Sequence, residues 1–173
     1  MKTAKFVLIT LVICLFTSSL FSQNDDNSKR TVGLSATIQS EQFGINIPIW
    51  IYKNVTIGPA IQLLYSENVG TDLGLGLVSK FYINNGKVSP YVGIKLGFIS
   101  NIPNETTIVQ QMATTDIIGG FAFGGEYFFD KQFSISIEIQ GNFTKSDPES
   151  QRFGNPDGLN FNTASMISAN IYF

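Results

Sequence analysis

A long alternation of polar and apolar residues near the C-terminus constrains the fold more than any other feature. Residues 133–144 read FSISIEIQGNFT, with an apolar residue or glycine at every odd position and a polar residue at every even one. A period of two is the side-chain period of a β-strand, so the two sets lie on opposite faces. The segment therefore predicts a strand with one apolar face and one polar face, and the polar face carries an ionisable residue, Glu138.

Seven further segments alternate in the same way and are separated by turn signals. They are residues 31–39, 43–53, 55–65, 71–83, 89–99, 117–129 and 159–173. Three connections are tight turns, at residues 53–54, 83–88 and 129–132, whereas most of the others are longer and more polar. Short turns at one rim and long loops at the other are typical of outer-membrane barrels. The pattern predicts an all-β fold, an eight-stranded antiparallel up-and-down transmembrane β-barrel.

The first 22 residues have the order of regions found in a secretory signal peptide. Lys2 and Lys5 precede the apolar run 6–16, and Ser22 offers a small residue for cleavage. The run is too short for a membrane-spanning helix, which needs about 20 residues. We therefore expect residues 1–22 to be a signal peptide, 23–30 a polar lead-in and 31–173 an outer-membrane β-barrel of a Gram-negative bacterium.

Cysteine content and charge narrow the class further. The only cysteine, Cys14, lies in the predicted signal peptide, and the residues before it (LVI) lack the small residue expected ahead of a lipidated cysteine. The mature chain is therefore expected to have neither disulfides nor a lipid anchor. Loss of Lys2 and Lys5 changes the net charge from −2 to −4, which gives no reason to expect nucleic-acid binding.

Four ionisable residues lie near strand centres: Lys80, Lys95, Glu126 and Glu138. Each occupies the face opposite its strand's apolar row, and that face is otherwise rich in Gly, Ser, Ala and Thr. Eight strands enclose only enough space for side chains, so the large Phe and Ile rows fit lipid and the small polar rows fit the lumen. We expect these four residues to form a lumen charge cluster that pairs internally, with Lys95 as the partner of Glu138. An ion pathway or gate is the alternative interpretation.

Aromatic residues concentrate at the ends of the predicted strands. Near the tight turns lie Trp50, Tyr52, Phe81, Tyr82, Tyr91, Tyr127, Phe128, Phe129, Phe133 and Tyr172; near the long loops lie Phe43, Tyr65, Phe98, Phe143 and Phe161. Membrane barrels carry aromatic girdles at both interfaces. We expect these two groups to be the girdles.

The C-terminal residues carry a family resemblance. Ile167, Ala169, Ile171 and Phe173 alternate up to the end of the chain, which looks like the signal by which the outer-membrane assembly machinery recognises its clients. With FSQ at the signal junction and the strand spacing, the whole mature chain resembles small outer-membrane β-barrel proteins of the Bacteroidota type. The overall pattern is similar to the eight-stranded OmpA and OmpX barrels. The resemblance implies outer-membrane lipid and the assembly machinery as partners.

The absence of histidine argues against an enzyme. Barrel lipases, deacylases and omptin-type proteases use a histidine as general base, and this chain has none. Glu126 and Glu138 could suggest glycosidase chemistry, but a narrow lumen gives a sugar chain no access. Without His or a mature Cys, we expect neither a transition metal nor another cofactor. The favoured hypothesis is a non-enzymatic membrane barrel with a filled polar lumen and a structural or surface-contact role. A narrow pore or transporter, and a soluble lipocalin-like binder of an apolar ligand, remain alternatives.

Overall fold

The computed structural model describes residues 30–39, 42–66, 70–103 and 112–173. The predicted signal peptide and the lead-in up to Lys29 lie outside these residues. Arg30–Tyr172 forms one compact unit. None of the described segments is a helix with the length and hydropathy needed to cross a membrane.

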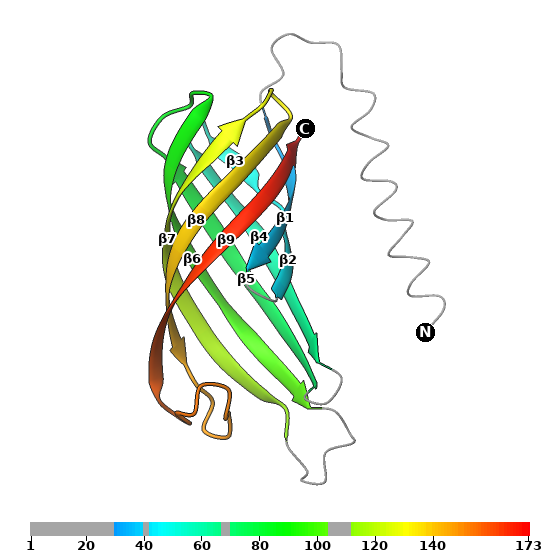
Figure 1. The fold of residues 1–173 in the computed structure, drawn as a ribbon, viewed down its shortest axis with the longest axis vertical. Helices are drawn as coiled ribbons and strands as arrows, with labels where there is room; N and C mark the ends of the chain where they lie inside the picture. The colour runs from blue at the N-terminus through cyan, green and yellow to red at the C-terminus, as the bar shows by residue number, and fades with distance from the viewer. Residues whose placement is uncertain (1–29, 40–41, 67–69, 104–111) are drawn as a thin grey trace, which may run out of the picture. The chain divides into compact units, whose positions relative to one another are not determined.

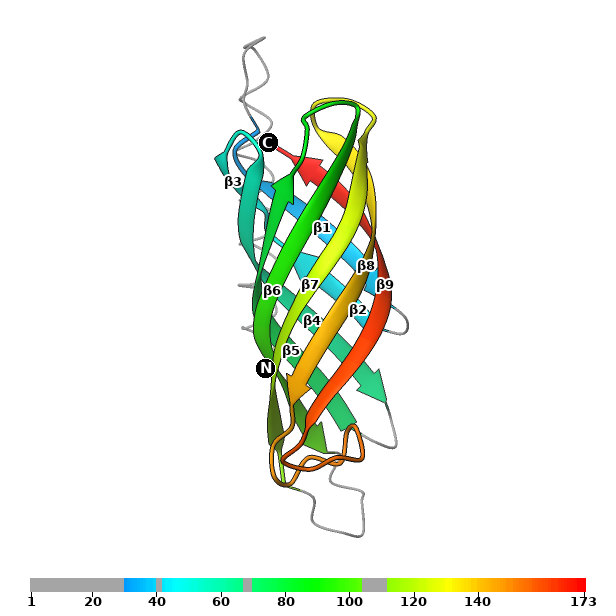
Figure 2. The same ribbon diagram turned by 90° about the vertical axis from the view of Figure 1, so that its left-hand side faces the viewer.

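The described chain forms one closed antiparallel sheet (Figures 1 and 2). Its strands are β1 (Gly33–Gln39), β2 (Gln42–Asn46), β3 (Ile49–Tyr52), β4 (Val55–Ser66), β5 (Gly70–Tyr82), β6 (Val88–Pro103), β7 (Thr114–Phe128), β8 (Phe133–Lys145) and β9 (Leu159–Tyr172). Apart from β2 and β3, neighbours along the chain pair with each other; β1 also pairs with β9, and β2 and β3 both pair with β4. Because β2 and β3 share one place in the wall, the described sheet is an eight-stranded barrel, as the alternation predicted.

The sequence predicted one strand over residues 43–53, but the structure interrupts it at Ile47–Pro48. Proline has no N–H to donate to a ladder. Backbone bonds nevertheless continue across the break, because Ile47 N–H donates to Pro59 at 3.0 Å and the Pro48 carbonyl accepts from Gly33 at 2.7 Å. The neighbouring strand approaches closely here: a Cβ on Gly58 would lie 1.9 Å from the Ile47 oxygen.

The strand register fixes the shear of the barrel. One row of paired residues runs Pro90, Gly125, Ile137, Ile167, Ile38, Phe43, Leu63, Leu73 and back to β6 at Ser100. After one circuit of the barrel, the row that started at Pro90 returns to β6 at Ser100. The shift of 10 residues is the shear number of the barrel. With about 3.3 Å per residue and about 4.8 Å between strands, this shear corresponds to a strand tilt of about 40°. That tilt lies within the range of outer-membrane barrels.

Side chains of β8 follow the predicted alternation. Ser134, Ser136 and Glu138 are buried, whereas Ile137 and Ile139 are 61% and 63% exposed. Gly141 is the exception on the outer face, because the Phe121 ring of β7 covers it. The outer face is apolar and the inner face polar, which is the reverse of a soluble protein.

The first hairpin is shorter than the rest of the wall. Pairing between β1 and β9 ends at Ile38 and Ile167, although β9 continues to Leu159. In Figure 1 β1 and β2 stop part-way along the barrel, while β9 runs on towards the long-loop end. In contrast, β6 and β7 exceed their predicted limits and reach Pro103 and Thr114.

A carboxylate organises the predicted tight turn between β7 and β8. Asp130 Oδ1 accepts the backbone N–H groups of Gln132 and Phe133, both at 2.7 Å. These two bonds, that of Phe133 first, lower the pKa of the Asp130 carboxyl below its usual value. The interaction therefore needs the ionised form, and it is lost as the pH falls through the lowered pKa.

The close approach at the strand break predicts different costs for two glycines. Gly58→Ala should lower the free energy of unfolding by about 1–3 kcal/mol, because the backbone must move to admit the new Cβ. Gly125→Ala is the matched control, since nothing lies within 4 Å of a Cβ built there. Denaturant unfolding of the reconstituted protein measures both, and equal stability of the two variants would contradict the register at Ile47.

Candidate functional site

Glu126 is the centre of the lumen network. Its side chain is fully buried. Tyr82 donates to Oε2 at 2.6 Å, and Oε1 accepts from Ser134 at 2.5 Å, Tyr172 at 2.7 Å and Asn170 at 3.3 Å. Four donors from three strands satisfy one carboxylate, which is how a buried charge becomes tolerable.

Lys80 supplies the opposite charge to this centre. Its Nζ lies 3.8 Å from Glu126 Oε2 and 4.4 Å from the centroid of the Tyr91 ring. The lysine side chain is 7% exposed, so the pair is shielded from water. The predicted pairing of opposite lumen charges is therefore confirmed for Lys80 and Glu126.

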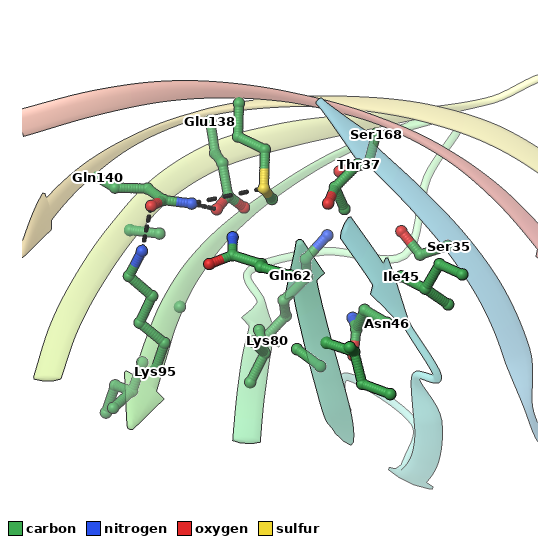
Figure 3. A pocket seen from close by; sticks show the side chains of 17 residues that line it. Ser35, Thr37, Ile45, Asn46, Gln62, Lys80, Lys95, Glu138, Gln140 and Ser168 are labelled. Carbon is green, nitrogen blue, oxygen red and sulfur yellow. Dashed lines mark hydrogen bonds between the residues drawn. The ribbon is translucent and has the colours of Figure 1, made fainter. Parts of the chain in front are cut away.

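Glu138 has different partners from those the sequence suggested. Lys95 was its expected partner, but Tyr91 and Gln140 hold the Glu138 carboxylate, each at 2.6 Å. Lys95 Nζ donates instead to the Gln140 side-chain oxygen, so an amide lies between the two charges (Figure 3). The direct pairing was wrong because lumen-facing amide and phenol groups were not counted as partners.

Five of the predicted girdle aromatics are also placed wrongly by the sequence argument. Trp50, Tyr82, Tyr91, Phe128 and Tyr172 lie on the inner face, and the last four are at most 5% exposed. Trp50 stacks on Tyr82 at 5.0 Å, Tyr82 contacts Tyr91 at 5.5 Å, and Phe128 contacts Tyr172 at 6.0 Å. The alternation of faces along a strand could have shown this. Tyr82 lies two residues from Lys80, and Phe128 two residues from Glu126, so each shares the inner face with that charged residue.

An arginine caps this aromatic cluster at the short-turn end. The Arg30 guanidinium lies 3.8 Å from the Phe128 centroid and 5.8–5.9 Å from those of Tyr172 and Trp50. Its Nε donates to the Lys131 carbonyl at 2.9 Å. The short-turn end of the lumen is therefore packed with aromatic rings, while Tyr52, Tyr127, Phe129 and Phe133 remain on the outside.

A cavity of about 50 Å³ lies beside the lumen network. Lys80, Lys95 and Glu138 are its charged lining residues, and Asn46 Oδ1 and Ser168 Oγ, also in its wall, have no hydrogen-bond partner. A cavity needs about 10–15 Å³ to admit one water, so this space is large enough for water to enter. Figure 3 shows Lys80, Lys95 and Gln62 directed into it.

A second polar cluster, which the sequence argument missed, lies at the long-loop end. Arg152, in the loop between β8 and β9, forms an ion pair with Asp72 of β5, and Asn101 also donates to Asp72, at 2.7 Å. In the same region Asp116 accepts from the Ser150 hydroxyl. Asp72 lies on the same face of β5 as Lys80, and Asp116 on the same face of β7 as Glu126, because each pair is an even number of residues apart. A search for charged residues that included the strand ends would therefore have found them.

Among the described residues, no three His, Cys, Asp or Glu side chains group closely enough to hold a metal ion. Of the predicted assembly signal, Ile167, Ala169 and Ile171 lie on the outer face of β9, and Phe173 is exposed. Recognition by the assembly machinery stays a prediction.

The fold is shared with solved outer-membrane barrels. The N-terminal β-barrel domain of Pseudomonas aeruginosa OprF is 14% identical, with a TM-score of 0.51, and the match covers 82% of this chain and 95% of that one. Neisserial surface protein A is 12% identical, with a TM-score of 0.57 and coverage of 82% and 93%. No protein-family model matches the chain, and a search of curated proteins finds no match. The described residues therefore have the architecture of small outer-membrane β-barrels.

Neutralising Glu126 should destabilise the barrel. Glu126→Gln leaves Lys80 without its charge partner and puts an NH2 group among the donors, so we expect a loss of about 3 kcal/mol of unfolding free energy. Adding Lys80→Met should recover part of this loss. Glu149→Gln, in an exposed loop, is the control. A Glu126→Gln variant as stable as the control would contradict the proposed role of this carboxylate.

The inward position of Trp50, the only tryptophan, can be tested with brominated lipid. We expect weak quenching of its fluorescence, because the indole stacks inside the barrel. The double variant Trp50→Phe/Tyr52→Trp moves the tryptophan to a side chain that is 71% exposed and should be quenched strongly. Equal quenching of the two proteins would show that Trp50 faces lipid and belongs to the girdle, which would contradict its inward position.

Proposed function

We propose that this protein is a non-enzymatic integral outer-membrane barrel with a plugged lumen and a role in envelope structure or surface contact. The observation that carries the proposal is the inverted distribution of side chains. Apolar residues cover the outer face, and a bonded polar network with an aromatic end fills the inner one. A soluble barrel that binds an apolar ligand needs the opposite arrangement.

The lumen network favours a plug over a pore. Tyr82 and Lys80 of β5 and Tyr172 of β9 reach Glu126 of β7, so side chains close the short-turn end from two sides. Ion passage there would require these bonds to break together. At the other end, Arg152 and Asp72 join the β8–β9 loop to β5.

Location in the outer membrane is part of the same proposal. The predicted signal peptide supports export, and the outer apolar band between aromatic residues suits a bilayer. The likeness to Bacteroidota-type barrels rests on sequence features alone. For surface contact, the loop between β8 and β9 is the best candidate because its contacts with Asp72 and Asp116 give it a defined shape.

Two simple assays test membrane integration. After expression in a Gram-negative host, the protein should stay in the outer-membrane fraction through a carbonate wash. Unboiled and boiled samples should migrate differently on a gel, because a closed barrel resists detergent until heated. Release by carbonate together with unchanged mobility would contradict the proposal.

Planar-bilayer recordings separate the plug from the pore. We expect no steady openings from the native protein. Tyr82→Ala/Tyr172→Ala should produce openings, because both phenol groups bond to Glu126 across the lumen. Tyr52→Ala, which truncates an exposed side chain, is the control. Steady openings of the native protein that disappear on Glu138→Gln would favour the pore instead.

A further inference from the structure

The short β1–β2 hairpin leaves a notch in the barrel wall on the long-loop side. Beyond Ile167 no described residue pairs with the β1 side of β9, although β9 runs on to Leu159. Tyr172 N–H and the Gly158 carbonyl both bond towards β8. In an antiparallel ladder, bonding direction alternates by residue, so the odd-numbered Phe161 and Thr163 direct their backbone polar groups into the notch.

The notch lies within the apolar band. Phe161 contacts Phe143 at 4.9 Å and belongs to the long-loop girdle. Thr163 and Ser165 follow it towards the centre of the barrel, and at the strand tilt above Ser165 lies about 10 Å below Phe161. Both hydroxyl side chains are exposed on the outer face. The backbone groups in the notch and these two hydroxyl groups therefore face the hydrocarbon layer of the bilayer. No water is present there, so the backbone groups need another hydrogen-bond partner.

The cavity reaches both strands that flank the notch. Gln62 of β4 and Met166 of β9 line it. Each is the sequence neighbour of the residue at which its strand's pairing with the hairpin ends. The charged side chains of its lining are two lysines, Lys80 and Lys95, and one carboxylate, Glu138. Lys80 is already paired with Glu126, so Lys95 is the lining lysine available to an anionic head. Lys95 is bonded to an amide and not to a carboxylate.

We propose that the notch and the cavity together bind a single-chain amphiphile with a monoanionic head, such as a fatty acid. The head lies in the cavity near Lys95, and the chain leaves sideways past Thr163 into the bilayer. A second copy of the chain fits less well: two barrels in the same orientation cross their tilted β9 strands at a large angle, so the open edges cannot pair. The inference rests on the proposed membrane location.

Short-range quenching in vesicles tests this site. A bimane label is placed at Thr163→Cys or, as a control on the opposite wall, at Leu75→Cys, with Cys14→Ser in both chains. The probe is 5-doxylstearic acid, whose nitroxide lies close to its head. We expect stronger quenching at position 163 than at position 75. The methyl ester of the probe, which lacks the charge, should quench the two positions equally.

Two further variants identify the parts of the site. Lys95→Met should require a roughly tenfold higher probe concentration for half-maximal quenching at position 163, because a charge-assisted hydrogen bond is lost. Inserting Val-Thr after Gln39 and Thr-Val before Gln42 lengthens the first hairpin and should remove the excess quenching. The same four residues inserted at Asp130–Lys131 should not.

The outcomes distinguish the two proposals. Three results would overturn the amphiphile site while leaving the membrane barrel intact. The acid could quench positions 163 and 75 equally, or the methyl ester could give the same excess quenching at position 163 as the acid. The third is a Lys95→Met titration that is unchanged from that of the native lysine. Heat-dependent gel mobility confirms that each variant is folded. A chain that fails to insert into vesicles at all would overturn the proposed function itself.

Discussion

The demand for backbone hydrogen bonds governs this fold. A strand surrounded by hydrocarbon cannot leave its N–H and C=O groups unpaired, and a sheet meets that demand only by closing on itself. Here closure depends on the short β1–β2 hairpin, which joins β9 to β4. The chain tolerates Pro48 in this region because Ile47 and Gly33 carry the bonds around it. Where the hairpin ends, none of the described residues pairs with β9 on that side, and this polar edge is the place that we propose for binding.

Closure in turn determines the chemistry of the interior. Eight strands leave a narrow lumen, and the residues that fill it must satisfy one another. Glu126 does so through four donors and one lysine, and Glu138 through a phenol and an amide. Such bonds hold opposite walls together and replace the apolar core of a soluble barrel. Buried carboxylates in this setting are part of the packing, and the cavity beside them is the place where the packing is incomplete.

Much of this architecture could be predicted from the sequence, because alternation assigns a face to each strand residue. Strand number, tight turns and the inward position of Lys80, Lys95, Glu126 and Glu138 all follow from period and parity. Partner choice does not, since Glu138 selects Tyr91 and Gln140 through a register that a single sequence does not reveal. The aromatic girdle was over-assigned because Trp50, Tyr82 and Tyr172 were grouped by position along the strand instead of by face. The shear and the notch need cross-strand pairing, which no local pattern specifies.

Residues 133–144 provide the most direct test of the inverted barrel. Nitroxide labels placed one at a time along β8 in vesicles report oxygen, which concentrates in lipid, and a water-soluble nickel chelate, which does not. The account predicts that oxygen accessibility alternates with a period of two and is highest at Ile135, Ile137 and Ile139. It predicts low accessibility to both reagents at Ser136, Glu138 and Gln140. A flat profile, or one in which the odd positions are shielded from oxygen, would contradict a membrane barrel with this face towards lipid.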